Sequence, residues 1–104
     1  MEKPVILIAG QKVEPAPPKM KVWREFLRTA GRDLSNETLE HFMDAQVELI
    51  VTAFGKPEIV NKESVEENLE IAEVVPLVRK LFKWIQLLTF DKLADAPNVE
   101  AEKA

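Results

Sequence analysis

The sequence predicts a mainly α-helical (α+β) domain, in which a small N-terminal β-hairpin is followed by a bundle of about four helices. Two observations indicate this class. Over most of residues 19–90 apolar residues recur every three or four positions, which is the periodicity of amphipathic helices. A short β-branched run beside a glycine precedes them, as is typical of a strand and its turn. The chain has 104 residues, of which 46% are hydrophobic and 31% charged, as expected for one folded domain.

The N-terminal segment predicts the hairpin. Pro4 to Ile8 forms the first strand, Gly10-Gln11 the turn, and Lys12 to Glu14 the return strand. A two-stranded hairpin alone is only marginally stable in water, so we expect it to pack on the helices or on another subunit. An extended connector is then predicted by three prolines, Pro15, Pro17 and Pro18.

The first helix is predicted from about Lys19 to Ala30, with Gly31 as its C-terminal stop. Its apolar face holds Val22, Trp23, Phe26, Leu27 and Ala30. A second face carries cations at steps of three and four residues. This basic stripe consists of Lys21, Arg24, Arg28 and Arg32.

The second helix is predicted to begin at an N-cap, Ser35 or Asn36, and to end at Gly55 and Pro57. Its apolar face holds Leu39, Phe42, Met43, Val47, Ile50, Val51 and Phe54. A neighbouring face is acidic. This acidic stripe consists of Glu37, Glu40, Asp44 and Glu48.

Two more helices are predicted after the loop. Ser64 to Glu67 has the pattern of a capping box, which predicts a short acidic helix at about Val65 to Ile71. Pro76 fits the first turn of a last helix that begins near Glu73. That helix is predicted to reach about Phe90. We therefore expect one domain over residues 1–93 and a flexible C-terminal tail over residues 94–104.

The apolar arc of the last helix is wider than a single stripe. One interpretation is a central helix that its own chain buries on two sides. The other is that one side, with Leu81, Trp84 and Leu88, binds another protein. Both tryptophans, Trp23 and Trp84, lie on apolar helix faces, where core residues are commoner than binding hot spots.

The charged stripes also allow more than one interpretation. They are solvated faces, or they pair within the molecule, or they meet between molecules. Residues 1–32 have a net charge of +4, residues 33–75 of −9 and residues 76–104 of +1. A basic face that joins the acidic face of the next copy repeats head to tail, which gives rings or open spirals.

The composition also limits the chemistry. The chain has no cysteine, and its one histidine is His41, so thiolate metal sites and cysteine nucleophiles are excluded. Glu37 and His41 have helical metal-pair spacing, but two ligands do not make a site. We predict no enzyme activity and no catalytic, cofactor-binding or metal-binding residues. The net charge of −4 makes nucleic acid an unexpected partner, and no apolar run predicts a signal peptide or a membrane span.

Three segments resemble one known family. They are Lys21-Val22-Trp23-Arg24 after the proline-rich connector, AFGKPEI at the end of the second helix, and Val65-Glu66-Glu67-Asn68-Leu69 leading to Pro76. Over about residues 4–93 the chain is similar to the tail assembly chaperones of long-tailed bacteriophages (siphophages) and related prophages.

The resemblance implies a role in tail morphogenesis. Members of the family bind the tape measure protein, keep it soluble and help recruit the tail tube protein. They self-associate, in rings or spirals, and no cofactor or catalytic residue is implied. They are often made with a longer, frameshifted form, whose extension would attach at the C-terminal tail. The resemblance also implies action in the cytoplasm of the infected or lysogenic bacterial host and absence from the mature virion.

Two alternatives stay open from the sequence. One is a structural tail or connector component that remains in the virion. The other is a small regulator that binds nucleic acid through the basic helix, Lys21 to Arg32, although the acidic stretch that follows would repel phosphate.

Overall fold

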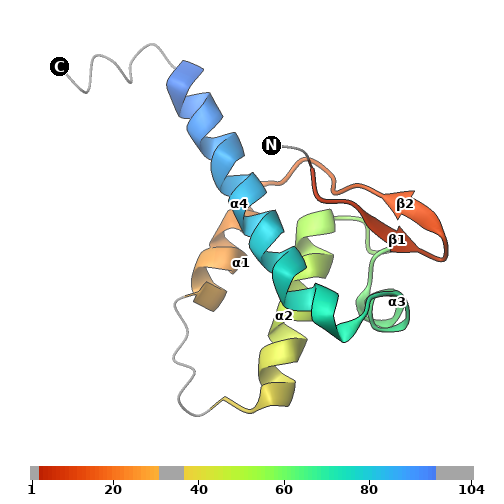
Figure 1. The fold of residues 1–104 in the computed structure, drawn as a ribbon. Helices are drawn as coiled ribbons and strands as arrows, with labels where there is room; N and C mark the ends of the chain where they lie inside the picture. The colour runs from red at the N-terminus through yellow and green to blue at the C-terminus, as the bar shows by residue number, and fades with distance from the viewer. Residues whose placement is uncertain (1–2, 31–36, 96–104) are drawn as a thin grey trace.

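The computed structural model describes residues 3–30 and 37–95, with side chains up to Thr89. The elements are listed in chain order: β1 (Ile6–Ile8), β2 (Gln11–Val13), α1 (Met20–Ala30), α2 (Leu39–Phe54), α3 (Lys62–Asn68) and α4 (Ile71–Asp95). The predicted fold class, a mainly helical chain with an N-terminal hairpin and about four helices, is confirmed. In Figure 1, α4 crosses α2, with the hairpin and α3 on one side and α1 on the other.

The hairpin turns one residue earlier than predicted. The strands pair antiparallel, with Ile6 opposite Val13 and Ile8 opposite Gln11. The turn is therefore Ala9-Gly10, not Gly10-Gln11. Ala9 (φ 52°) and Gly10 (φ 80°) are both left-handed, as in the two-residue turn whose twist matches that of the strands. Alternation along the strands buries Ile6, Ile8 and Val13 and exposes Leu7.

The hairpin packs on the rest of its own chain, which is one of the two expected arrangements. Its inward residues belong to the main core cluster. The turn is also tied to α3, because the Ala9 backbone N–H donates to Asn68 Oδ1 at 2.9 Å. Asn68 Nδ2 in turn donates to the Ser64 carbonyl at 2.8 Å. One exposed side chain therefore connects segments 59 residues apart.

The N-cap predicted for the second helix is wrong, and its end is confirmed. Thr38 caps α2, since its hydroxyl accepts from the His41 backbone N–H at 3.1 Å. Ser35 and Asn36 lie outside the described residues, as does Gly31. At the other end Gly55 is left-handed (φ 63°), and its N–H donates to the Val51 carbonyl, which is the usual glycine termination.

The N-cap of α3 differs from the prediction as well, and in this case it lies three residues earlier than the predicted Ser64. Asn61 is the N-cap, and its side chain accepts from the Ser64 N–H at 2.9 Å. The Ser64 hydroxyl lies within 3.0 Å of the Asn61 N–H and accepts from it. Ser64 is thus the third-residue partner of a capping box and not its first residue. The helix ends at Asn68, short of the predicted Ile71, because Leu69 is extended.

Helix α4 is longer at both ends than predicted. It begins at Ile71, so Pro76 is its sixth residue and lies in the second turn, not the first. Proline there removes the bond to the Ala72 carbonyl and crowds that carbonyl, and both residues are exposed. The Glu73 carboxylate accepts from the Glu70 N–H at 2.8 Å and caps the start. The helix passes Phe90 and includes Ala94 and Asp95, where a tail was predicted; residues 96–104 lie outside the described residues.

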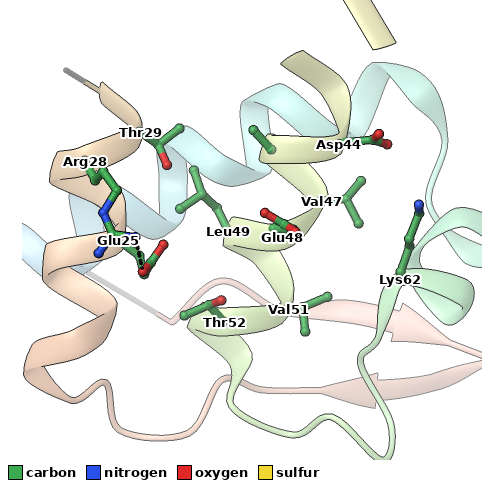
Figure 2. Close-up of a pocket in the computed structure, with 11 residues that line it drawn as sticks. Glu25, Arg28, Thr29, Asp44, Val47, Glu48, Leu49, Val51, Thr52 and Lys62 are labelled. Atoms are coloured by element: carbon green, nitrogen blue, oxygen red, sulfur yellow. Dashed lines mark ion pairs between the residues drawn. The ribbon is translucent and has the colours of Figure 1, made fainter. Parts of the chain in front are cut away.

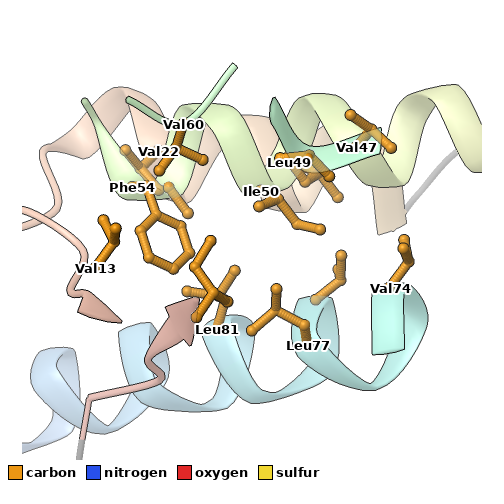
Figure 3. Close-up of a cluster of buried hydrophobic side chains, with 14 of the residues drawn as sticks. Val13, Val22, Val47, Leu49, Ile50, Phe54, Val60, Val74, Leu77 and Leu81 are labelled. Carbon is orange, nitrogen blue, oxygen red and sulfur yellow. The ribbon is translucent and has the colours of Figure 1, made fainter. Parts of the chain in front are cut away.

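The core lies mainly between α2 and α4. Ile50 and Phe54 of α2 and Leu81 of α4 are fully buried. Figure 3 shows these side chains between the two helices, together with Val74 and Leu77 of α4 and Val13 of the hairpin. Both helices therefore bury one face, as their apolar periodicity predicts.

The tie between the hairpin turn and α3 gives the first prediction. Asn68→Ala removes the acceptor for the Ala9 N–H, and we expect a loss of about 1 kcal/mol in the free energy of unfolding, measured with urea. Hydrogen exchange at the Ala9 amide should also accelerate. Glu67→Ala, an exposed neighbour on the same helix, is the control. Equal behaviour of the two variants would show that the tie does not stabilise the fold.

Candidate protein-binding surface

The three predicted binding residues of the last helix do not lie together on the surface. Leu81 is completely buried and Trp84 is 4% exposed, whereas Leu88 is 38% exposed. The prediction that Leu81 and Trp84 contact another protein is therefore wrong for this conformation. For these two residues the structure favours the alternative, a helix that its own chain buries.

Leu88 is exposed for a reason that follows from the helix itself. Val74, Leu77, Leu81, Trp84 and Leu88 succeed one another at steps of three and four residues and so share one face of α4. The first four are buried, and Leu88, one turn beyond Trp84, is partly exposed. The helix therefore carries the core stripe past the end of the core. Leu88 is where the apolar face of α4 meets solvent.

The basic stripe lies on the solvent face of α1. Lys21, Arg24 and Arg28 are exposed, and Arg32 lies outside the described residues. Arg28 pairs with Glu25 on the same helix at 2.9 Å, with side chains 70% and 39% exposed. An exposed pair of this kind contributes little stability. Lys21 and Arg24 have no ion-pair partner among the described residues.

Three residues of the acidic stripe, Glu40, Asp44 and Glu48, lie on α2, whereas Glu37 precedes the N-cap Thr38 and is outside the helix. Glu40 and Glu48 are exposed and Asp44 is half-buried. Within residues 3–30 and 37–95, none of these three forms an ion pair with the basic stripe. For Glu40, Asp44 and Glu48, pairing with Lys21, Arg24 or Arg28 inside one molecule, one of the sequence alternatives, is therefore not seen in the part that the structure describes. The carboxylates of Glu40, Asp44 and Glu48 remain open to a partner.

One residue of the basic stripe, Arg28, and two of the acidic stripe, Asp44 and Glu48, line a groove of about 600 Å³. Figure 2 shows Glu25, Arg28 and Thr29 of α1 on one side of α2 and Lys62 on the other, with Asp44 and Glu48 on α2 between them. Apolar side chains, among them Leu49, Val47 and Val51, also line it. Charges of both signs beside apolar groups are typical of protein–protein surfaces.

His41 offers no metal site in the part of the chain that the structure describes. His41 is exposed, and its backbone N–H serves the cap of α2. Within the residues that the structure describes, no three His, Cys, Asp or Glu side chains group as a metal site would require. None of the helices described is both long and apolar enough to span a membrane.

Periodicity did not identify all of the exposed apolar surface. Met20 of α1 is 64% exposed and Leu27 is 47% exposed, although Leu27 was assigned to the apolar face and Met20 was not singled out. Leu39, also predicted for an apolar face, is 77% exposed. Helical spacing predicts which residues share a face of a helix. It does not predict how far along that face another helix covers them, so the exposure of these residues could not be predicted.

Comparison of the chain with protein-family models, with curated proteins and with solved structures finds no significant match.

Alanine substitutions at Trp84 and Leu88 test whether Trp84 is buried and Leu88 is partly exposed. Trp84→Ala should lower the free energy of unfolding by about 3–5 kcal/mol, because it empties a buried site. Leu88→Ala should cost less than about 1 kcal/mol, because that side chain is already partly in water. Urea denaturation followed by circular dichroism measures both values. Equal losses would mean that Leu88 is as buried as Trp84.

Proposed function

We propose that this chain is a non-enzymatic tail assembly chaperone. In this role it binds the tape measure protein, helps recruit the tail tube protein and acts as a self-associating oligomer. The sequence resemblance supports the proposal through Lys21-Val22-Trp23-Arg24 and the stretch from Val65 to Pro76. The structural observation that carries it is Leu88, where an otherwise buried apolar stripe runs out into solvent.

The physical task of such a chaperone is to cover apolar helical surface. A tape measure protein without its tube exposes apolar helices, which aggregate unless another surface covers them. The partly exposed end of the α4 stripe, with the apolar residues of α1, offers a helical surface for packing helix on helix. Several associated copies would raise the local concentration of such surfaces along a long client.

The charged stripes support self-association in head-to-tail order. Lys21 and Arg24 on α1 and Glu40, Asp44 and Glu48 on α2 lack ion-pair partners within the described residues. Each molecule therefore presents unpaired cations on α1 and unpaired carboxylates on α2, and the basic face of one copy fits the acidic face of the next. Because the two faces differ, the contact repeats in a ring or an open spiral. Charge pairs of this kind set register and association rate more than affinity.

The proposed role also implies where in the cell the chain acts and at which stage of assembly. The chaperone would act in the cytoplasm of the infected or lysogenic host and leave before the virion is complete. Detection of the chain in purified virions would instead favour a structural tail or connector component. Salt-sensitive retention on DNA would favour the nucleic-acid-binding alternative.

Client binding is tested by co-expression with the tape measure protein of the same phage and pull-down on the tagged chain. We expect the wild type to retain the client and Leu88→Glu to retain at least about tenfold less, since a charge in an apolar contact is left unpaired. Thr89→Glu places the same charge on the next, exposed residue and should retain the client normally.

Circular dichroism must show the same helix content for both variants. Failure of the wild type to retain the client would contradict the proposed function. Equal retention by wild type and Leu88→Glu would exclude Leu88 from the client contact.

Self-association is tested by light scattering and charge reversal. The assembly should shrink as salt rises from about 0.1 M to about 1 M, where the screening length falls from about 10 Å to about 3 Å. Lys21→Glu alone and Glu48→Lys alone should each weaken it, because each places like charges opposite one another. The double variant should restore it, since the signs are then exchanged. Salt-independent size, or no rescue, would argue against the stripes as the interface.

A further inference from the structure

One apolar surface is shared by two helices. Trp23 of α1 and Phe82 of α4 are half-buried, and their rings lie 5.8 Å apart, centre to centre. Met20 and Leu27 continue this surface along α1 and are 64% and 47% exposed. We call these four residues the α1–α4 seam. Exposed large apolar side chains beside a pair of aromatic rings are typical of a contact surface.

The seam is bordered by positive charge on both helices. Arg24 lies between Met20 and Leu27, four residues after the first and three before the second. On α4, Arg79 is three residues before Phe82 and Lys83 is the next residue after it. All three cations are exposed and have no ion-pair partner in the part of the chain that the structure describes. Carboxylates are therefore the groups that this border attracts.

The dimensions of the seam fit a helix. Met20 and Leu27 are seven residues apart, which is about 10 Å or two turns along α1. Trp23 lies between them at the intermediate helical position. Partner helices that bind in apolar grooves use anchors at the same spacing, three, four and seven residues apart.

We propose that the α1–α4 seam binds an amphipathic helix of the client whose apolar stripe is flanked by Asp and Glu. This assignment rests on the proposed function, because it names the chemistry of the client segment that the chaperone covers. The apolar stripe of the client packs on Met20, Leu27 and the Trp23–Phe82 pair. Its carboxylates meet Arg79 and Lys83.

A second copy fits the seam less well. Its acidic stripe on α2 would satisfy the cations, but only Leu39 (77% exposed) adds a large exposed apolar side chain there. Beyond Leu39, the solvent face of α2 carries Asp44, Glu48 and Thr52, which are polar. An acid-flanked amphipathic helix satisfies both the charges and the apolar residues.

The first experiment uses two synthetic helical peptides with the same leucine stripe, one flanked by Glu and one by Lys. Fluorescence anisotropy should show that the wild-type chain binds the Glu peptide at least about tenfold more tightly than the Lys peptide, because like charges disfavour the second. Arg79→Glu/Lys83→Glu should reverse this preference, and Arg79→Lys/Lys83→Arg should keep it. Lys80→Glu is the matched control, since this exposed residue of α4 borders the hairpin side instead.

The second experiment repeats the pull-down of the tape measure protein with the same variants. Arg79→Glu/Lys83→Glu and Leu27→Asn should each reduce retention at least about fivefold, because one removes the charge match and the other an apolar anchor. Lys80→Glu should retain the client. Light scattering on each variant shows whether self-association, assigned to Lys21 and Glu48, is unchanged.

The outcomes separate the two proposals. If the wild type retains the client and every variant does too, the seam assignment fails while the chaperone function stands. If the wild type does not retain the client but binds the Glu peptide selectively, the chaperone function fails, while the preference of the seam for an acid-flanked amphipathic helix stands. Equal binding of both peptides, equal loss with Lys80→Glu, or loss confined to variants that no longer self-associate would overturn the seam assignment. So would charge-dependent binding to phosphatidylserine vesicles without binding to the Glu peptide.

Discussion

The packing of α4 across α2 is the constraint on which the rest of the structure depends. Ile50, Phe54 and Leu81 are fully buried where these helices meet, and the hairpin, α3 and α1 add side chains to the same cluster. A chain of this size has apolar surface for one core, so the elements are arranged around this crossing. α4 has 25 residues and α2 has 16, and the longer helix carries its apolar face past the region that the shorter one covers.

Function is proposed for the surfaces that this arrangement leaves open. α1 meets α4 through the stacked pair Phe26 and Phe82, 5.4 Å apart, and through Trp23. α1 also packs on α2 and buries Val22, and its remaining face meets solvent, where apolar residues adjoin cations. The carboxylates of α2 face away from the core. Separation of charge along the sequence thus becomes separation of charge over the surface, which is the arrangement that favours oriented contacts between proteins.

Local chemistry explains both what was predicted well and what was misplaced. Gly55 ended α2 as expected because a left-handed terminal residue strongly favours glycine. The caps were misplaced because several polar residues compete near each helix start. In the structure Thr38, rather than Ser35 or Asn36, caps α2, and Asn61, rather than Ser64, caps α3. Pro76 suggested a later start for α4, but an exposed proline in the second turn removes a single hydrogen bond, a cost that the packing of the rest of the helix can offset.

By itself, the sequence determined the class of fold, the number of helices, the apolar faces of α1, α2 and α4 and, apart from Glu37, the helix that carries each described residue of the charged stripes, because periodicity and charge are properties of neighbours along the chain. Only the tertiary structure decided that Leu81 and Trp84 lie inside while Leu88, Met20 and Leu27 meet solvent. All five have apolar side chains at helical spacing. Their exposure depends on where another helix covers them, and this is fixed by contacts between residues far apart in the chain.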